Sequence, residues 1–251
     1  MIEFRDVTLR LGDHAVLERI SFKAQFYERI AILGRSGSGK TTILKLMVGL
    51  VRPDEGKILV DGQDITELSE SQMRDARMNF SIVFQEGALF DSLSVRENVA
   101  FCLKEHSRLS EEEIDKRVRV HLRRLGIEEA IDLMPEELSG GMQRRVAIAR
   151  SLAECEPRMV LYDEPTTGLD PISADYTIRL IKELSNGELP DRLGFFVVTH
   201  EVMYAAKVAE RFMYLRDKKI GFDGSINELR STKDPELKTF INQLFGYENR
   251  V

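Results

Sequence analysis

Residues 34–41 form a glycine-rich segment whose residue types are suited to binding phosphate groups. The segment reads Gly34-Arg35-Ser36-Gly37-Ser38-Gly39-Lys40-Thr41 and is followed by Thr42. Glycines at this spacing allow backbone N–H groups to close around the β- and γ-phosphates of a nucleotide. Lys40 would place a positive charge on the phosphates, and the hydroxyl of Thr41 would bind Mg²⁺. The alternative is a surface Gly/Ser turn, but the apolar strand pattern before the segment and the helical pattern after it favour a phosphate loop.

A pair of carboxylates forms the second candidate site. The apolar run from Met159 to Tyr162 is directly followed by Asp163 and Glu164. A carboxylate at the carboxyl end of a buried strand lies where doubly wound α/β sheets bind ligands. We expect Asp163 to hold Mg²⁺ through water, and Glu164 to accept a proton from an attacking water molecule. An acidic loop at a strand end is the alternative, which a nearby phosphate loop makes less favourable.

A Ser-Gly-Gly segment at residues 139–141 precedes a second helical pattern. The apolar positions of that helix include Met142, Val146, Ala149 and Leu152. Small residues before a helix leave its first N–H groups open to an anion. Two such helix starts in one chain predict a site shared by two copies, in which this segment of one copy closes on the nucleotide of the other. If it stood alone, a Gly-Gly turn capping a helix would be the simpler interpretation.

The elements that must position these segments predict an α/β fold. Three apolar runs read as buried strands, and helical stretches lie near them: Arg29–Leu33, Met159–Tyr162 and Phe195–Thr199. Such alternation is typical of a mostly parallel sheet covered on both faces. Three further runs predict an antiparallel lobe, the last of them closed by the turn Asp61-Gly62: Ile2–Leu9, Val16–Phe26 and Lys57–Val60. A helix is predicted over Ile43–Val51, before Pro53.

The middle and the end of the chain are predicted to be helical. Ser110 and Glu113 form a capping box, and their helix is predicted to run to Gly126. The segment from Glu86 to Pro135 would be a helical insertion into the α/β core. The tail from Pro235 to Gly246 places apolar residues on one helical stripe: Leu237, Phe240, Ile241, Leu244 and Phe245. This stripe could clasp a neighbouring copy or an accessory protein, although packing on its own chain is favoured.

Together these motifs resemble the ATPases of ABC transporters over essentially the whole chain. Ser139-Gly140-Gly141-Met142-Gln143 resembles the signature loop of that family, and Thr167-Gly168-Leu169-Asp170 resembles its D-loop, with Gly168 where alanine is more usual. Gln85 looks like the Q-loop glutamine, which senses Mg²⁺ and the transmembrane partner. His200 looks like the switch histidine, which contacts the γ-phosphate. We expect Gln85, Asp163 and His200 to emerge together at the carboxyl ends of parallel strands.

The resemblance implies a fold and a domain organisation. The fold would be a P-loop NTPase (RecA-like) core with a mostly parallel sheet, an antiparallel β subdomain and an inserted helical subdomain. Residues 1–251 would form a single ABC ATPase domain. Within it, residues 1–85 and 158–224 would make the β subdomain and the core, 86–157 the helical subdomain with the signature loop, and 225–251 a C-terminal helical tail.

The resemblance also implies an activity and a set of site residues. The chain would hydrolyse ATP with Mg²⁺ as a homodimer bound to a transmembrane permease, and Glu164, His200 and Lys40 would be catalytic. The predicted nucleotide contacts are Gly34, Arg35, Ser36, Gly37, Ser38, Gly39, Lys40, Thr41, Thr42, Gln85, Ser139, Gly140 and Gly141. The predicted metal ligands are Thr41, Gln85 and Asp163.

Two positions depart from the family pattern. The aromatic residue that stacks on adenine falls, by spacing, at Leu11, which can pack on a base but cannot stack on it by π overlap; His14 is the alternative. Tyr27 stands in the turn before the phosphate-loop strand, where glycine is common. The first departure bears on the selectivity for the base, and the second on the turn alone.

A narrower resemblance indicates what the transporter moves. The apolar stretch from Phe84 to Val95, together with Glu97–Phe101 and Asp163–Ile172, resembles ATPases of bacterial Mla-type lipid transporters, which work with MCE-domain proteins. This implies phospholipid transport at the inner membrane, an MCE-domain partner and a small accessory subunit. Alternatively, Ala88, Leu89 and Phe90 fill the core of the helical subdomain. The alternative functions are the ATPase of a small-solute importer or exporter, or a non-transport ABC ATPase. A P-loop kinase or GTPase would leave Ser139–Gly141 unexplained.

Composition and charge exclude some classes of partner. The chain has 36 basic and 42 acidic residues and a net charge of −6, which disfavours binding to a nucleic-acid backbone. It has no apolar run long enough to cross a bilayer and no secretion segment at its N-terminus, so we expect it at the cytoplasmic face of the inner membrane, held there by its permease. Cys102 and Cys155 lack ligand spacing and are expected to be buried or idle thiols in a reducing compartment.

Overall fold

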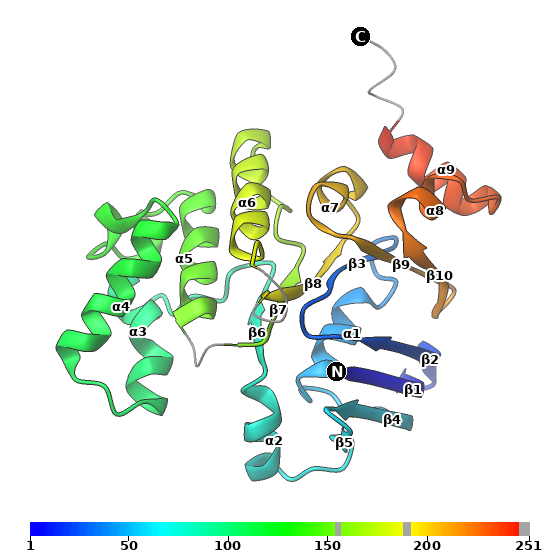
Figure 1. Ribbon diagram of the computed structural model, residues 1–251, viewed down its shortest axis with the longest axis horizontal. Helices are drawn as coiled ribbons and strands as arrows, with labels where there is room; N and C mark the ends of the chain where they lie inside the picture. The colour runs from blue at the N-terminus through cyan, green and yellow to red at the C-terminus, as the bar shows by residue number, and fades with distance from the viewer. Residues whose placement is uncertain (154–156, 188–191, 246–251) are drawn as a thin grey trace.

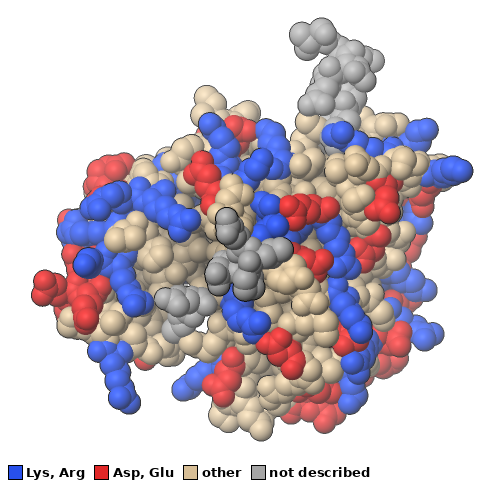
Figure 2. Space-filling model, viewed as in Figure 1, with Lys and Arg blue, Asp and Glu red and all other residues tan. Residues whose placement is uncertain are grey.

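The chain forms two β-sheets, with helices packed on both faces of the larger one and a helical lobe at one end (Figure 1). This computed structural model describes residues 1–153, 157–187 and 192–245, with side chains described up to residue 242. Cys155 and Gly246 therefore lie outside the described residues, as do the side chains of Leu244 and Phe245. On the face shown in Figure 2, basic and acidic side chains are interspersed over the surface.

The smaller sheet is antiparallel, as predicted. Its strand order is β2-β1-β4-β5. The strands are β1 (Ile2–Leu11), β2 (His14–Ala24), β4 (Glu55–Val60) and β5 (Gln63–Asp64). Ile2 pairs with Ala24 on one side and with Val60 on the other. The apolar residues of β1 up to Leu9 and of β2 from Leu17 onward are buried in one core.

The larger sheet carries the predicted parallel strands. Its order is β10-β9-β3-β8-β7-β6, and only the β9–β10 pair is antiparallel. The strands are β3 (Arg29–Leu33), β6 (Phe80–Val83), β7 (Met159–Asp163), β8 (Gly194–Thr199), β9 (Arg211–Arg216) and β10 (Lys219–Ser225). The predicted α/β class with a mostly parallel sheet is therefore confirmed.

Each face of the larger sheet has its own hydrophobic core. One face, with Leu33, Tyr162 and Phe195, packs against the helices of the middle and the end of the chain. The other face, with Ile32 and Phe196, packs against the first helix and the antiparallel sheet. Since neighbouring residues of one strand point to opposite faces, the continuous apolar runs of β3, β7 and β8 are explained by burial on both sides.

The helices begin largely where the capping residues predict. Their bounds are α1 (Lys40–Met47), α2 (Glu70–Arg77), α3 (Val95–His106), α4 (Glu111–Arg124), α5 (Gly140–Ala153), α6 (Pro171–Leu184), α7 (Val202–Val208), α8 (Ile226–Arg230) and α9 (Pro235–Phe245), with 3₁₀ turns at Glu128–Ala130 and Pro135–Glu137. The capping box of Ser110 and Glu113 is confirmed.

Helix α1 corrects the predicted span Ile43–Val51. The correction concerns the end of the helix, because its start at Lys40, after the left-handed N-cap Gly39, is where a phosphate loop places it. It ends at Met47, two residues before Gly49, whose φ is 63°. A residue with positive φ cannot continue a right-handed helix, so the apolar residues after Met47 belong to the following loop.

The tail helix α9 packs on its own chain. Leu237 and Ile241 are buried in the core that covers one face of the larger sheet. The ring of Phe240 lies 5.0 Å from the ring of Tyr214 on β9, measured between centroids. The prediction that the apolar stripe of this helix packs on its own chain is therefore confirmed for the residues whose side chains are described.

Candidate active site

The predicted site residues follow the carboxyl ends of four neighbouring parallel strands. The phosphate loop follows β3, His200 follows β8, Asp163 and Glu164 lie at the end of β7, and Gln85 follows β6. Because these strands are adjacent and parallel, their ends meet at one edge of the sheet (Figure 1). The expected convergence of Gln85, Asp163 and His200 at this edge is confirmed.

The phosphate loop is a tight cradle at the start of α1. Gly39, with φ 101°, is the N-cap of this helix, and a Cβ on it would lie 3.1 Å from Leu17 Cδ2 and 3.3 Å from Val16 Cγ1. Only glycine satisfies both the backbone angle and the close approach of β2. The buried Ser38 Oγ has no hydrogen-bond partner among the described residues. A buried hydroxyl of the phosphate loop without a partner suits an oxygen of a phosphate group.

Lys40 folds back over this cradle. Its side chain is buried, and its Nζ donates hydrogen bonds to Gly34 O at 3.0 Å and Arg35 O at 3.1 Å. The same Nζ lies 3.4 Å from Glu164 Oε1. The ammonium group therefore lies between the phosphate loop and the carboxylate at the end of β7, where it can neutralise added negative charge.

Glu164 lies at the centre of the polar contacts at this edge. It is 8% exposed, and its φ of 45° is unusual for a residue with a side chain. Its Oε2 lies 3.0 Å from His200 Nδ1 and also accepts hydrogen bonds from the His200 backbone N–H at 3.4 Å and from Thr167 Oγ1 at 3.3 Å. Three groups thus hold the carboxylate in place, as a positioned general base requires.

Asp163 is in contact with one of the two other predicted metal ligands. Thr41 Oγ1 donates to Asp163 Oδ1 at 2.8 Å, so the ends of β7 and the phosphate loop are joined directly. Burial raises the pKa of Asp163, and the hydrogen bond from Thr41 opposes this rise. A buried carboxylate beside a hydroxyl offers the oxygen ligands that Mg²⁺ prefers. The Gln85 side chain makes no hydrogen bond to either of them within the described part of the chain, and it is exposed.

The Ser139–Gly141 segment is not brought to the phosphate loop of its own chain. Ser139 is exposed and caps α5, its Oγ accepting from the Met142 N–H at 3.3 Å. Among the residues that the structure describes, no hydrogen bond or ion pair joins this segment to residues 34–42. A loop that is exposed on one copy, and not bonded to that copy's own cradle among the described residues, is available to a second copy.

A match to a family of known proteins covers most of these elements. The model of the ABC transporter family matches residues 17–167, which include the phosphate loop, Ser139–Gly141 and both carboxylates. The chain belongs to this family. It is therefore an ABC ATPase, and its fold is the one that the motifs imply.

Individual relatives of this ABC ATPase match along nearly its whole length. The intermembrane phospholipid transport system ATP-binding protein MlaF of Escherichia coli is 38% identical over 244 residues, which cover 96% of this chain and 88% of MlaF. The chloroplastic protein TRIGALACTOSYLDIACYLGLYCEROL 3 of Arabidopsis thaliana is 39% identical, with 96% of this chain and 73% of that protein covered. A solved dimeric structure of the ATP-binding cassette MJ0796 with ADP and Pi has a TM-score of 0.81 at 32% identity, covering 90% of this chain and 99% of that one.

The two departures from the family pattern lie at the surface of the ABC ATPase. Leu11 is 64% exposed at the end of β1, where it pairs across the hairpin with His14. The start of β2 reaches Gly39 through Val16, so this hairpin borders the phosphate loop. Tyr27 lies in the turn before β3 and is partly exposed. Each of these side chains is thus accessible at the surface.

Some polar residues of this region were not predicted from the sequence. Thr166 Oγ1 donates to the Glu201 side chain, which ties the segment after β7 to the residue after His200. Arg144 is buried on α5 and donates to the backbone carbonyls of Phe84 and Gln85. The only sequence signal for Arg144 is an arginine in the first turns of a helix that is otherwise apolar on its inner face.

Among the described helices, none is long and apolar enough to span a membrane.

Proposed function

We propose that this ABC ATPase powers the movement of phospholipid by a separate transmembrane permease at the bacterial inner membrane. The observation that carries this proposal is the similarity to MlaF, a phospholipid transport ATP-binding protein, over 96% of the chain. The similarity to a chloroplast protein over the same share of the chain supports a role in a lipid pathway. The site geometry supports the energy source, because Lys40, Glu164 and His200 lie together beside a phosphate cradle.

The chemistry follows from the charges and donors of the site. Backbone N–H groups of residues 34–41, Lys40 and the Ser38 hydroxyl would bind the phosphates of ATP, and Thr41, Asp163 and Gln85 would hold Mg²⁺. The metal ion would neutralise the charge that develops on the phosphate oxygens. Glu164 would take the proton of the attacking water, while His200 holds Glu164 in place and donates to the γ-phosphate. Ser139, Gly140 and Gly141 of a second copy would cap that phosphate.

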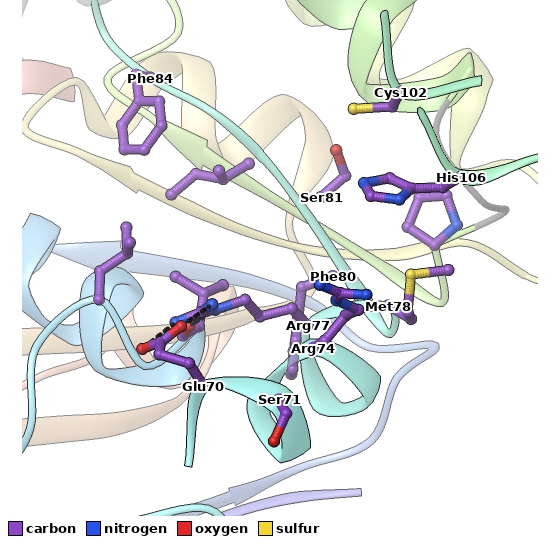
Figure 3. Close-up of a pocket in the computed structure, with 14 residues that line it drawn as sticks. Glu70, Ser71, Arg74, Arg77, Met78, Phe80, Ser81, Phe84, Cys102 and His106 are labelled. Carbon is purple, nitrogen blue, oxygen red and sulfur yellow. Dashed lines mark hydrogen bonds and ion pairs between the residues drawn. The ribbon is translucent and has the colours of Figure 1, made fainter. Parts of the chain in front are cut away.

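A cavity next to the end of β6 suits the docking of the permease. It has a volume of about 650 Å³ and lies between the loop after α1, helix α2, strand β6 and helix α3 (Figure 3). Its apolar wall includes Leu50, Met78, Phe80, Ile82 and Phe84. Leu50 is 55% exposed and Met78 is 43% exposed, so apolar surface continues to the mouth. A concave, apolar surface of this size fits one turn or two of an inserted helix.

The charges around this cavity indicate the chemistry of the inserted segment. Arg77 pairs with Glu70 at 2.8 Å (Figure 3), whereas the side chain of Arg74 has no ion pair or hydrogen bond within the described residues. His106 lines the same cavity from α3. We therefore expect a short apolar helix of the permease that carries a carboxylate facing Arg74. Cys102 also lines the cavity.

A charge introduced at the mouth of this cavity tests the docking. Met78→Asp is expected to abolish co-purification of the chain with its permease from detergent-solubilised membranes, because a carboxylate would be desolvated in an apolar contact. Val120→Asp is the matched control, since Val120 is a similarly exposed apolar residue, 50% exposed on α4 and not among the cavity residues. Retained co-purification of Met78→Asp, at an unchanged melting temperature, would place the permease elsewhere.

Other parts of the assembly follow from the same proposal. Two copies would form a homodimer at the cytoplasmic face of the inner membrane, peripheral through the permease. An MCE-domain protein and a small accessory subunit would complete the transporter. Residues 1–85 and 158–224 would bind the nucleotide, residues 86–157 would move as the helical subdomain, and residues 225–251 would form the tail.

Transport by the purified complex tests the proposed substrate. The complex captured from membranes through this chain is expected to move a fluorescent phospholipid only when ATP and Mg²⁺ are present. The same complex carrying Lys40→Ala is expected to move none, because it would lack the ammonium group that binds the phosphates. ATP hydrolysis that is fully active but indifferent to phospholipid, with no lipid moved, would contradict the proposal and favour another solute.

A further inference from the structure

Two arginines of α5 bind the backbone of the loop that follows β6. Arg144 donates from Nη1 to Phe84 O at 2.6 Å and from Nη2 to Gln85 O. Arg150 donates from Nη2 to Gly87 O at 3.0 Å and from Nη1 to Ala88 O at 2.8 Å. Four carbonyls within five successive residues are therefore bound by one helix. We call this set of contacts the arginine clamp.

The bound loop has an unusual backbone conformation. Gly87 has φ 74° and Ala88 has φ 48°, both in the left-handed region, which alanine rarely adopts. These residues lie beyond the end of β6 and outside its ladder with β7, and the backbone bond within the loop runs from Gly87 N–H to Phe84 O at 2.9 Å. The carbonyls of Phe84, Gln85 and Gly87 accept part-buried bonds, and the bond to Ala88 O is exposed. Because carbonyls withdrawn from water need donors, side chains of α5 supply what the sheet does not.

The burial of Arg144 argues that this role is specific. Its side chain is 5% exposed, and no carboxylate is paired with it among the described residues. Its Nε has no partner there either, so its terminal nitrogens are directed to the loop. Burying a guanidinium costs free energy, which bonds from a charged donor to carbonyl oxygens partly offset. A smaller apolar residue would pack at this position without that cost, so packing alone does not explain an arginine.

The clamp connects three parts of the proposed machinery. Helix α5 starts directly after Ser139, which would cap the nucleotide of a second copy. The bound loop carries Gln85, and Phe84 at its start lines the docking cavity. The Arg150 guanidinium also lies 5.7 Å from the centre of the Phe90 ring, and that ring lies 4.7 Å from the ring of Phe101 on α3. The far end of the loop is thus fixed to the helical lobe.

We propose that Arg144 and Arg150 are positioning residues that make the loop Phe84–Ala88 and helix α5 move as one body. The functional consequence rests on the proposed function. A permease segment that enters the cavity would shift Gln85 and Ser139 together. The physical core of the proposal concerns only this chain, because the clamp joins residues of one polypeptide. Coupling between two sites requires a physical element whose position affects both of them.

Hydrogen exchange of the purified chain, monitored at residues 85–91, tests the clamp. Arg144→Met removes the donors at similar volume and is expected to speed amide exchange in this segment by at least about tenfold, with β7 and α1 unchanged. Arg145→Met is the matched control. The Arg145 guanidinium donates to Gly126 O at 3.2 Å and to Gly141 O at 3.3 Å, and not to this loop, so faster exchange is expected near residues 126 and 141 and not at 85–91. Equal exchange at 85–91 in Arg144→Met and the parent chain would overturn the proposal.

Turnover separates positioning from simple structural support. In the complex with its permease, Arg144→Met is expected to lower kcat by about tenfold with the KM for ATP within about twofold, because the groups at the phosphate loop are untouched. Arg144→Lys, which keeps one charged donor, is expected to recover part of the kcat. An unchanged kcat would overturn the coupling. If Arg144→Met fails to fold, Arg150→Met carries both tests, since Arg150 is only half-buried. A complex that moves no phospholipid would refute the proposed substrate, while the exchange data would still decide the clamp.

Discussion

Replacing Glu164 by glutamine is expected to lower the turnover of ATP by about 10²-fold or more while MgATP binding is retained. Glutamine has the shape of glutamate but cannot accept the proton of the attacking water. The side chain is buried and contacts Lys40 and His200, so the amide would keep its place beside the phosphate loop. With hydrolysis blocked, ATP would hold two copies together. Phosphate release reports the turnover, and size-exclusion chromatography with ATP reports the closed dimer.

The control for this variant is an acidic residue outside the site. Glu183 is exposed on α6, and Glu183→Gln is expected to hydrolyse ATP like the parent chain. The two variants change the net charge equally, so a general electrostatic effect would appear in both. Hydrolysis by Glu164→Gln at the rate of the parent chain would remove Glu164 from the role of general base.

Two inactive variants are expected to regain activity when they are mixed. Ser139→Arg would block the cap on the neighbour's nucleotide, and Lys40→Ala would remove the charge that binds the phosphates. In a mixed dimer, the intact cradle of the first variant faces the intact Ser139–Gly141 segment of the second. If the two variants pair at random, half of the dimers are mixed, and each mixed dimer has one working site of its two. At most about a quarter of the parent activity is therefore expected to return. ATPase activity of the equimolar mixture measures this.

The control is each variant alone at the total protein concentration of the mixture, and each should remain inactive. The exposure of Ser139, and the absence of described hydrogen bonds and ion pairs between its segment and the phosphate loop of the same chain, are the structural reasons for expecting a shared site. A mixture as inactive as its components, at concentrations where the parent chain dimerises with ATP, would contradict the head-to-tail arrangement.

The site was predictable where chemistry depends on short, local patterns. The phosphate loop, the carboxylates after β7 and the histidine after β8 each follow an apolar run, and parallel strands bring such ends to one edge. The capping box of Ser110 was equally local, because it depends on residues three apart. Both kinds of prediction rest on patterns of residues that are close together in the sequence.

The rest depends on contacts between distant segments. No residue type signals that Glu164 adopts φ 45°, since this angle is set by the surrounding contacts of β7 and β8. Strands β9 and β10 were not among the predicted elements. Strand β10 is an edge strand with exposed positions, whereas β9 is buried and its apolar run over residues 212–215 was a signal that could have predicted it. The arginine clamp joins residues about 60 positions apart, so its partners cannot be identified from the pattern of α5 alone.

A crystal structure of Glu164→Gln grown with ATP and Mg²⁺ tests the central claim most directly. We predict two copies related head to tail, each with the phosphates of ATP on residues 37–41, Mg²⁺ beside Thr41 and Asp163, and the γ-phosphate capped by the partner's Ser139. Nucleotide bound away from residues 34–42, with that cradle empty in both copies, would contradict the account.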